Sequence, residues 1–227
     1  MKDNVKEKYE KLYTEAPVAN IEDDFFGYRR NRVLAALYRD GRGKRILDLG
    51  AGGGAVSRFF QSLGYDVTAI EWVRSSLEKM RAAGIAAVEH DVEKTPYPFS
   101  DNAFDEVFWG DNIEHLFDPE SVAREIFRIL RPGGRLVLST PNQGWVINRL
   151  YFALMGVPRR TEGHKNEIWN WDHIRYFNTT AMARFLRKCG FVKPRFLGSD
   201  QRRLFDALSR YSPSLFSSIM VVEAYKE

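Results

Sequence analysis

The chain has 227 residues, of which 44% are hydrophobic and 28% charged, a composition that excludes a disordered or collagen-like chain. The net charge of +4 conceals an asymmetry: residues 1–141 hold 20 Lys and Arg against 23 Asp and Glu, whereas residues 142–227 hold 14 against 7. A basic final third is typical of a solvated face, or of a surface that attracts an anionic substrate, a nucleic acid or a membrane.

The single cysteine, Cys189, cannot form an internal disulfide or a cysteine-based zinc site. Residues 1–13 lack the apolar core of a signal peptide, and no stretch approaches the roughly 20 apolar residues that cross a bilayer. We therefore predict a cytoplasmic protein with a single domain over residues 1–227, either a monomer or a homodimer.

Residues 1–43 are predicted to form a helical N-terminal segment, with Val33, Leu34 and Leu37 at helical spacing. Residues 44–141 alternate short apolar runs with amphipathic segments. This pattern predicts strands at 45–50, 66–70, 86–90, 104–110 and 135–140, and helices around 56–63, 73–80 and 122–130. Strands that alternate with helices indicate right-handed crossovers and a parallel sheet covered on both faces.

After Pro141 the alternation stops. Residues 142–178 are aromatic, basic and irregular, and we interpret them as a lid insertion over the carboxyl edge of the sheet rather than a separate domain. A helix from about residue 179 to Gly190, and strands near 191–198 and 218–225, would complete the sheet within residues 179–227.

The turn after the first strand, Gly50-Ala51-Gly52-Gly53-Gly54, predicts a ligand site. Glycines allow a sharp turn and close approach of a ligand to the backbone, and the N-terminus of the next helix offers free N–H groups. The turn also fits the fingerprint of dinucleotide-binding proteins, but an isolated match of that kind is a weak signal.

Three acidic residues, Asp48, Glu71 and Asp91, end the first three predicted strands. Open α/β sheets bind ligands in the crevice at these carboxyl ends. Asp48 would repel a pyrophosphate and suits a ligand that carries a positive charge. Glu71 is placed to accept both hydroxyls of a ribose, and Asp91 to accept from an adenine amino group while Val92 packs on the ring.

Several motifs, in this order, resemble the class I S-adenosylmethionine-dependent methyltransferases: LDLGAGGG at 47–54, TPYPFSDNAFDEVFWGDNIEHL at 95–116 and ILRPGGRLVLSTPN at 129–142. Together with HIRYFNTTAMARFLRKCGF at 173–191, they are similar to the small-molecule branch that includes the ubiquinone-biosynthesis O-methyltransferases. The resemblance implies an α/β, three-layer Rossmann-like sandwich. Its seven-stranded sheet would have the order 3-2-1-4-5-7-6 with the last strand antiparallel, and its cofactor would be S-adenosyl-L-methionine.

The resemblance also implies roles by position. The proposed cofactor contacts are Gly50, Ala51 and Gly52 along the methionine moiety, Asp48 near its amino end, Glu71 on the ribose, Trp72 beside the adenine, Asp91 and Val92 at the adenine edge, Gly110 and Asp111 on the methionine part, and Arg29 on the carboxylate. The family often has a cysteine where this chain has Ala51, a small departure that does not exclude the cofactor.

Two histidines are the candidate general bases: His115, just after the fourth strand, and His173, at the end of the lid. An ordinary imidazole titrates near pH 6.5 and can accept a proton at neutral pH. Some quinone-type relatives use a divalent ion near the corresponding acids, which makes Glu114 a conceivable ligand, but the spacing here has no metal signature and we predict none.

The predicted function is in-line methyl transfer to an oxygen or nitrogen atom of a small molecule. The aromatic and basic side chains of the lid suit a partly apolar, partly anionic acceptor. The alternatives are an RNA methyltransferase that uses the basic final third, an NAD-linked oxidoreductase, and a subunit that binds the cofactor without activity. Nucleic acid is disfavoured because no recognition module is evident. Contact of residues 145–157 with a membrane surface is a less favoured interpretation of their apolar character.

Overall fold

The structure is a computed structural model that describes residues 29–159 and 173–227, except for the side chain of Arg29. Its centre is a seven-stranded sheet of order β3-β2-β1-β4-β5-β7-β6. The strands are β1 (Arg45–Leu49), β2 (Asp66–Glu71), β3 (Ala86–Glu89), β4 (Phe104–Gly110), β5 (Leu130–Pro141), β6 (Val192–Ser199) and β7 (Ile219–Tyr225).

The neighbouring pairs among the first five strands are parallel, whereas β7 lies antiparallel between β5 and β6. The predicted fold class and strand order are therefore confirmed.

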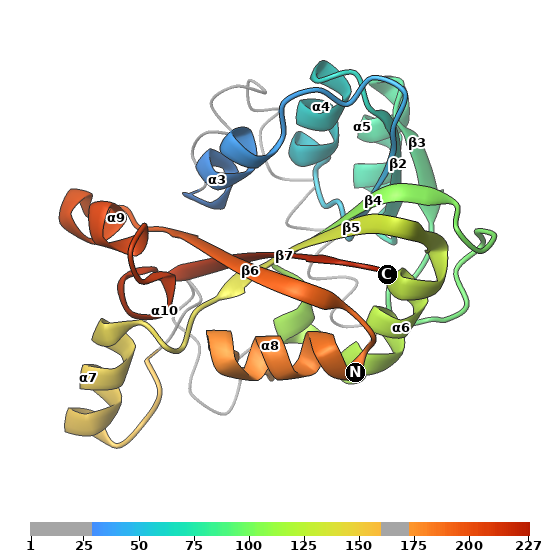
Figure 1. Ribbon diagram of the computed structural model, residues 1–227. Coiled ribbons are helices and arrows are strands. Elements are labelled where there is room, and N and C mark those ends of the chain that lie inside the picture. The colour runs from blue at the N-terminus through green and yellow to red at the C-terminus, as the bar shows by residue number, and fades with distance from the viewer. Residues whose placement is uncertain (1–28, 160–172) are drawn as a thin grey trace.

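Helices cover both faces of the sheet (Figure 1). The helices α3 (Arg29–Leu37), α4 (Ala55–Ser62) and α5 (Arg74–Ala82) lie on one face, and α6 (Pro119–Ile129) and α8 (Thr179–Lys188) on the other. The remaining short elements are η1 (Ile113–His115), α7 (Val146–Met155), α9 (Arg203–Ser209) and α10 (Pro213–Phe216).

Alternating side chains of the central strands fill the two layers. In β1, Ile46 packs toward the layer of α4 and α5, whereas Leu47 and Leu49 pack toward that of α6 and α8. Phe60 of α4 and Ile126 of α6 are each fully buried on their own side of the sheet. This two-sided burial is why the strands read as continuous apolar runs.

The structure differs from the sequence analysis in three places. The strand β5 begins at Leu130, which we had assigned to the preceding helix, because Leu130 adopts an extended conformation and pairs with Phe104 ahead of a register shift. The predicted lid of residues 142–178 contains the regular helix α7, and its residues 160–172 lie outside the described residues. Two short helices, α9 and α10, connect β6 to β7 where no helix was predicted.

None of the described helices combines the length and apolar character that a membrane crossing requires.

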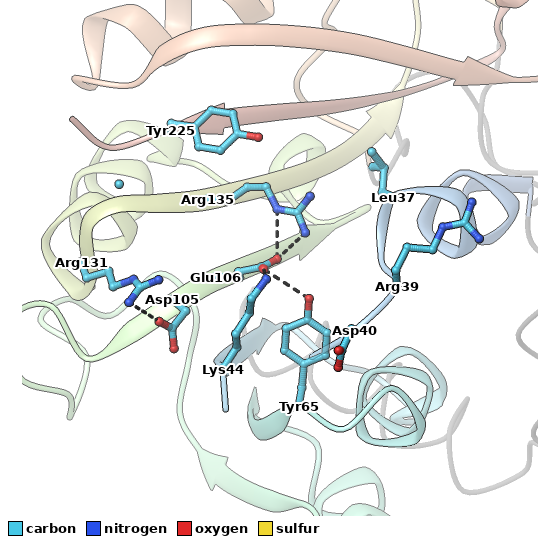
Figure 2. Close-up of a pocket in the computed structure, with 11 residues that line it drawn as sticks. Leu37, Arg39, Asp40, Lys44, Tyr65, Asp105, Glu106, Arg131, Arg135 and Tyr225 are labelled. Carbon is cyan, nitrogen blue, oxygen red and sulfur yellow. Dashed lines mark hydrogen bonds and ion pairs between the residues drawn. The ribbon is translucent and has the colours of Figure 1, made fainter. Parts of the chain in front are cut away.

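At the amino ends of β1, β4 and β5, a cavity of about 440 Å³ is bordered by charged side chains (Figure 2). Its centre is the buried carboxylate of Glu106. Glu106 accepts hydrogen bonds from Arg135 (Nε, 3.0 Å), from the hydroxyl of Tyr65 (3.2 Å) and from Lys44 (3.3 Å). Arg131 pairs with Asp105 at 2.9 Å beside this cluster. These ion pairs join β1, β4 and β5 at their amino ends, opposite the end of the sheet that carries the glycine turn.

We expect Glu106→Gln to lower the free energy of unfolding by about 3 kcal/mol, because it leaves the largely buried guanidinium of Arg135 without its main counter-charge. Denaturant unfolding with an unchanged m-value measures this loss. Asp40→Asn is the matched control, since it removes a carboxylate from the solvent-exposed pair with Arg42 and should leave the midpoint unmoved. Equal effects of the two substitutions would contradict the structural role of Glu106.

Candidate functional site

The candidate site lies at the carboxyl ends of the central strands, where the chain order reverses. The strand β1 pairs with β2 on one side and with β4 on the other, so Leu49 has Ile70 and Trp109 as its register partners. The segments that follow these three strands therefore leave the sheet side by side. This is the crevice in which open α/β sheets bind their ligands.

The glycine turn connects β1 to α4 in a backbone conformation that favours glycine. Gly50, Gly52 and Gly54 have φ values of 72°, 53° and 78°. A Cβ atom on Gly54 would lie 2.5 Å from Cγ of Met80, so the turn packs directly against α5. We call this backbone turn at the N-terminus of α4 the glycine cradle.

Glu71, at the end of β2, holds this turn in place. One carboxylate oxygen accepts from the backbone N–H of Gly52 at 2.8 Å, and the other accepts from those of Trp72 (2.7 Å) and Val73 (3.0 Å). The side chain is 6% exposed. The structure thus brings two predicted site residues, Glu71 and Gly52, into direct contact, and places the half-buried Trp72 beside them.

Asp48 lies beneath the turn and is 2% exposed. The hydroxyl of Ser57 in α4 donates to its carboxylate at 2.6 Å. Burial raises the pKa of Asp48 to about 6, although the Ser57 hydrogen bond and the positive charge of Arg30 oppose the shift. The charge of Glu71 also raises this pKa, as expected for two acids at one site. A cationic ligand would relieve both effects.

Asp91 follows β3, next in the sheet after β2. The backbone N–H of His90 donates to the carbonyl of Glu71 at 2.9 Å, which keeps the segment after β3 against the end of β2. Asp91 is partly buried and accepts from the N–H of Glu93 at 3.0 Å. Val92 packs against the core next to it. The three predicted acids therefore line adjacent strand ends, as the sequence analysis expected.

On the other side of the turn, Gly110 ends β4 and Asp111 follows with φ of 44°. A Cβ atom on Gly110 would lie within 2.8 Å of Arg30 and closer still to the ring of Phe108. Arg30 donates to Asp111 at 2.8 Å, and Ser139 donates to the other carboxylate oxygen at 2.9 Å. Arg30 thus brings a guanidinium group into the crevice.

Sequence reasoning proposed Arg29 for the cofactor carboxylate, and the side chain of Arg29 lies outside the described residues. It missed Arg30. The helical spacing of Val33, Leu34 and Leu37 indicates that a helix is present, and the structure shows that Arg30 of this helix reaches Asp111.

A further acidic residue, Glu114, is buried on the side of the crevice that follows β4. Glu114, in η1, is 2% exposed and accepts from the hydroxyl of Thr140 at 3.0 Å. Burial, followed by the nearby charge of Asp111, raises its pKa to about 8. The raised pKa favours the protonated form of Glu114, which can donate as well as accept a hydrogen bond.

The two candidate bases come together beside Glu114. The rings of His115 and His173 have centroids 4.7 Å apart at an angle of 74°. The backbone N–H groups of Ile174 and Arg175 donate to the carbonyl of Glu114, at 2.9 and 3.0 Å, which fixes the His173 segment against η1. The structure thus juxtaposes two residues that the sequence analysis selected from separate segments.

Glu114, His115 and His173 each offer one ligand atom, and these atoms lie within 4.8 Å of one another. A carboxylate with two imidazoles is a donor set that divalent metals use. The linear spacing could not predict this cluster because His173 belongs to a different segment. The expectation of a site without metal stays a prediction.

Taken together, the crevice has a glycine cradle and acidic groups on one side and an acid with two histidines on the other. The first part suits a cationic ligand with hydroxyl groups, and the second suits a group that gives up a proton. The two parts meet at Asp111, which raises the pKa of Glu114 and pairs with Arg30.

Comparison with known proteins identifies the family of this chain. A family model described as a methyltransferase domain matches residues 24–193. A ubiquinone biosynthesis O-methyltransferase of Aeromonas salmonicida is 34% identical over 145 residues, which cover 56% of this chain and 57% of that protein. A demethylmenaquinone methyltransferase of Clavibacter sepedonicus is 33% identical over 147 residues, 62% of this chain and 58% of the relative. The match thus spans a little over half of these relatives' length.

Among solved structures, a SAM-dependent methyltransferase from Thermotoga maritima superposes with a TM-score of 0.64 at 18% identity, covering 99% of this chain and 96% of that one. At this identity the similarity establishes the fold alone. The family model covers most of the chain, including the glycine turn, all three acids and both histidines. The chain therefore belongs to the methyltransferase domain family.

Proposed function

We propose that the protein is an S-adenosyl-L-methionine-dependent methyltransferase that methylates a hydroxyl group of a small molecule. The observation that carries this proposal is the glycine cradle fixed by Glu71, with Asp48 and Asp91 near the carboxyl ends of the two neighbouring strands, in a chain that belongs to a methyltransferase family. The acids disfavour a diphosphate at the turn and hence a dinucleotide cofactor.

The residues present fit this cofactor. Glu71 would accept from the ribose hydroxyls, Asp91 and Val92 would meet the adenine edge, and Trp72 would flank the ring. Asp48, Gly50, Ala51, Gly52, Gly110 and Asp111 would surround the methionine part. When bound, the cofactor supplies a methyl group activated on a sulfonium. Orientation of an acceptor against such a group can contribute roughly 7–11 kcal/mol to catalysis.

The acceptor would lie on the side of η1. We assign contact with its hydroxyl to His115 and His173, and a ring nitrogen of one of them would take the proton as the acceptor is methylated. Glu114 lies beside these histidines, and its raised pKa favours a neutral carboxyl group there. The names of the relatives favour oxygen over nitrogen as the methylated atom.

We further propose a cytoplasmic protein, a monomer or a homodimer, in which residues 44–141 form the cofactor-binding core and residues 142–178 the lid. The single, buried cysteine supports a reducing compartment.

The activity is tested with the purified chain. We expect S-adenosylmethionine and S-adenosylhomocysteine to raise the melting temperature, with NADH inactive. Incubation of a cell extract with isotope-labelled cofactor should then transfer the label to a small molecule, identified by mass spectrometry. Stabilisation by NADH alone would revive the oxidoreductase alternative, and label only in RNA would favour the nucleic-acid alternative. Bound cofactor without any labelled product would indicate a non-catalytic subunit.

In the same assay, His115→Gln and His173→Gln separate binding from catalysis. We expect the thermal shift with cofactor to persist and the transfer rate to fall about 10²- to 10⁴-fold for the variant that has lost the base. Because we predict no metal at the site, added divalent ions or a chelator should leave the rate unchanged. A rate that falls with the chelator and returns with an added divalent ion would contradict that prediction.

Cofactor affinity should depend on pH through Asp48. Its carboxyl has a folded-state pKa of about 6, so it is ionised above that pH and attracts a cationic ligand. We expect the dissociation constant to be flat above about pH 7 and to rise about tenfold per unit below pH 6. Asp48→Asn should bind weakly at all pH values and remove this dependence, as calorimetric titration would measure.

The same substitution should stabilise the free protein at pH 8. The folded state holds the Asp48 proton more tightly than the unfolded chain does, because its pKa is raised from 3.8 to about 6. The associated stability is present below about pH 4 and is lost as the pH rises to about 6. A variant less stable than wild type at pH 8 would show that ionised Asp48 is structural.

The ribose contact is tested by a double-mutant cycle. Glu71→Gln should weaken binding of S-adenosylhomocysteine by roughly 10- to 100-fold, as expected for two charge-assisted hydrogen bonds. For the 2′,3′-dideoxy analogue, the penalty of the substitution should be smaller, because those bonds are absent. Glu78→Gln, an exposed change on α5, is the control. Equal penalties for both ligands would mean that Glu71 acts only by holding the turn.

A further inference from the structure

The helix α7 follows directly from the end of β5 and exposes an unusual amount of apolar surface. Within it, Asn148 alone is buried. Every residue from Arg149 to Val157 is exposed. The exposed fractions reach 83% for Leu154, 60% for Met155 and 56% for Phe152. Exposed apolar patches of this kind on a folded chain mark interaction surfaces.

The other helices with strong apolar faces bury them. In α6, Val122, Ile126 and Ile129 pack on the sheet, and in α8 Met182 and Leu186 do so. Figure 1 shows α7 at the periphery, away from the central strands. We call the exposed apolar side chains of this region the α7 patch; it consists of Leu150, Tyr151, Phe152, Leu154, Met155 and Val157.

The charged residues next to the α7 patch in the sequence are arginines. Residues 142–161 contain three arginines and no acidic residue. Arg149 donates to the carbonyl of Gly144 at the base of the helix, and Arg159 lies over the ring of Trp145, 5.5 Å from its centroid. Arg202 lies over the same ring at 5.0 Å. Three arginines therefore lie at the helix base, of which Arg202 pairs with Asp200 at 3.4 Å, while apolar side chains occupy the far end of the helix.

We propose that the α7 patch binds the surface of a bilayer that contains anionic lipids. Apolar side chains with adjacent cations match the boundary between acyl chains and negatively charged headgroups. Ten residues of helix are about 15 Å long, half of the roughly 30 Å of a hydrocarbon core, so α7 would lie in the interface and not cross it. This inference does not depend on methyl transfer.

A paired charge substitution tests the proposal. We expect the full chain to co-sediment with vesicles of phosphatidylcholine and phosphatidylglycerol, less with phosphatidylcholine alone, and less at high salt. Leu154→Glu combined with Met155→Glu should lower the partition coefficient about tenfold or more. The control is Ala82→Glu with Ala83→Glu, which adds the same charges at the exposed end of α5 and should leave it unchanged.

A second measurement keeps the test independent of folding in the charged variant. A polarity-sensitive fluorophore on Leu154→Cys, in a Cys189→Ser background, should shift to the blue with the anionic vesicles, whereas one on Ala82→Cys should not. No co-sedimentation at low salt, or equal loss in both charged variants, would overturn the proposal. So would a dimer in sedimentation velocity that the α7 substitutions dissociate without any vesicle effect, because the α7 patch would then bind a second copy.

Discussion

The candidate site depends on one carboxylate. Glu71 bonds through one oxygen to the glycine turn after β1 and through the other to the segment after β2. Because both segments leave the sheet at the same edge, this side chain sets the width of the cradle between them. A glycine-rich turn has the greatest conformational freedom to lose on folding, and hydrogen bonds to a fixed acid at its centre offset that loss.

The acids of the crevice are held at a cost to stability. Asp48 and Glu114 are almost completely buried, and burial raises the pKa of each. Arg30 stabilises the ionised form of both, and it pairs directly with Asp111 between them. A buried acid with a raised pKa is a poor choice for stability alone, but such groups are common at functional sites. The amino edge of the sheet offers the contrast, since Glu106 there is fully partnered within the protein.

Much of the fold could be predicted from the sequence because the signals are local. Apolar runs that end in Asp48, Glu71 and Asp91 identify parallel strands, and parallel strands place their carboxyl ends together. Contacts between distant segments were less accessible. Nothing in the linear pattern distinguishes Arg30 from Arg29 as the partner of Asp111, and the contact of His115 with His173 requires the fold of the lid. Periodicity predicts apolar helices, yet it does not tell whether such a helix is covered, and α7 is the case in point.

The place of β7 has a consequence for how the chain matures. This strand is inserted between β5 and β6, and Glu223 bridges Arg135 on one neighbour and Arg195 on the other. During synthesis, β1 to β5 can assemble in order, but the outer edge of β5 stays unpaired until residues 219–225 leave the ribosome. For that interval the nascent chain presents a long open strand to other molecules. When β7 then pairs with β5 and β6, the ion pairs of Glu223 with Arg135 and Arg195 favour the observed register.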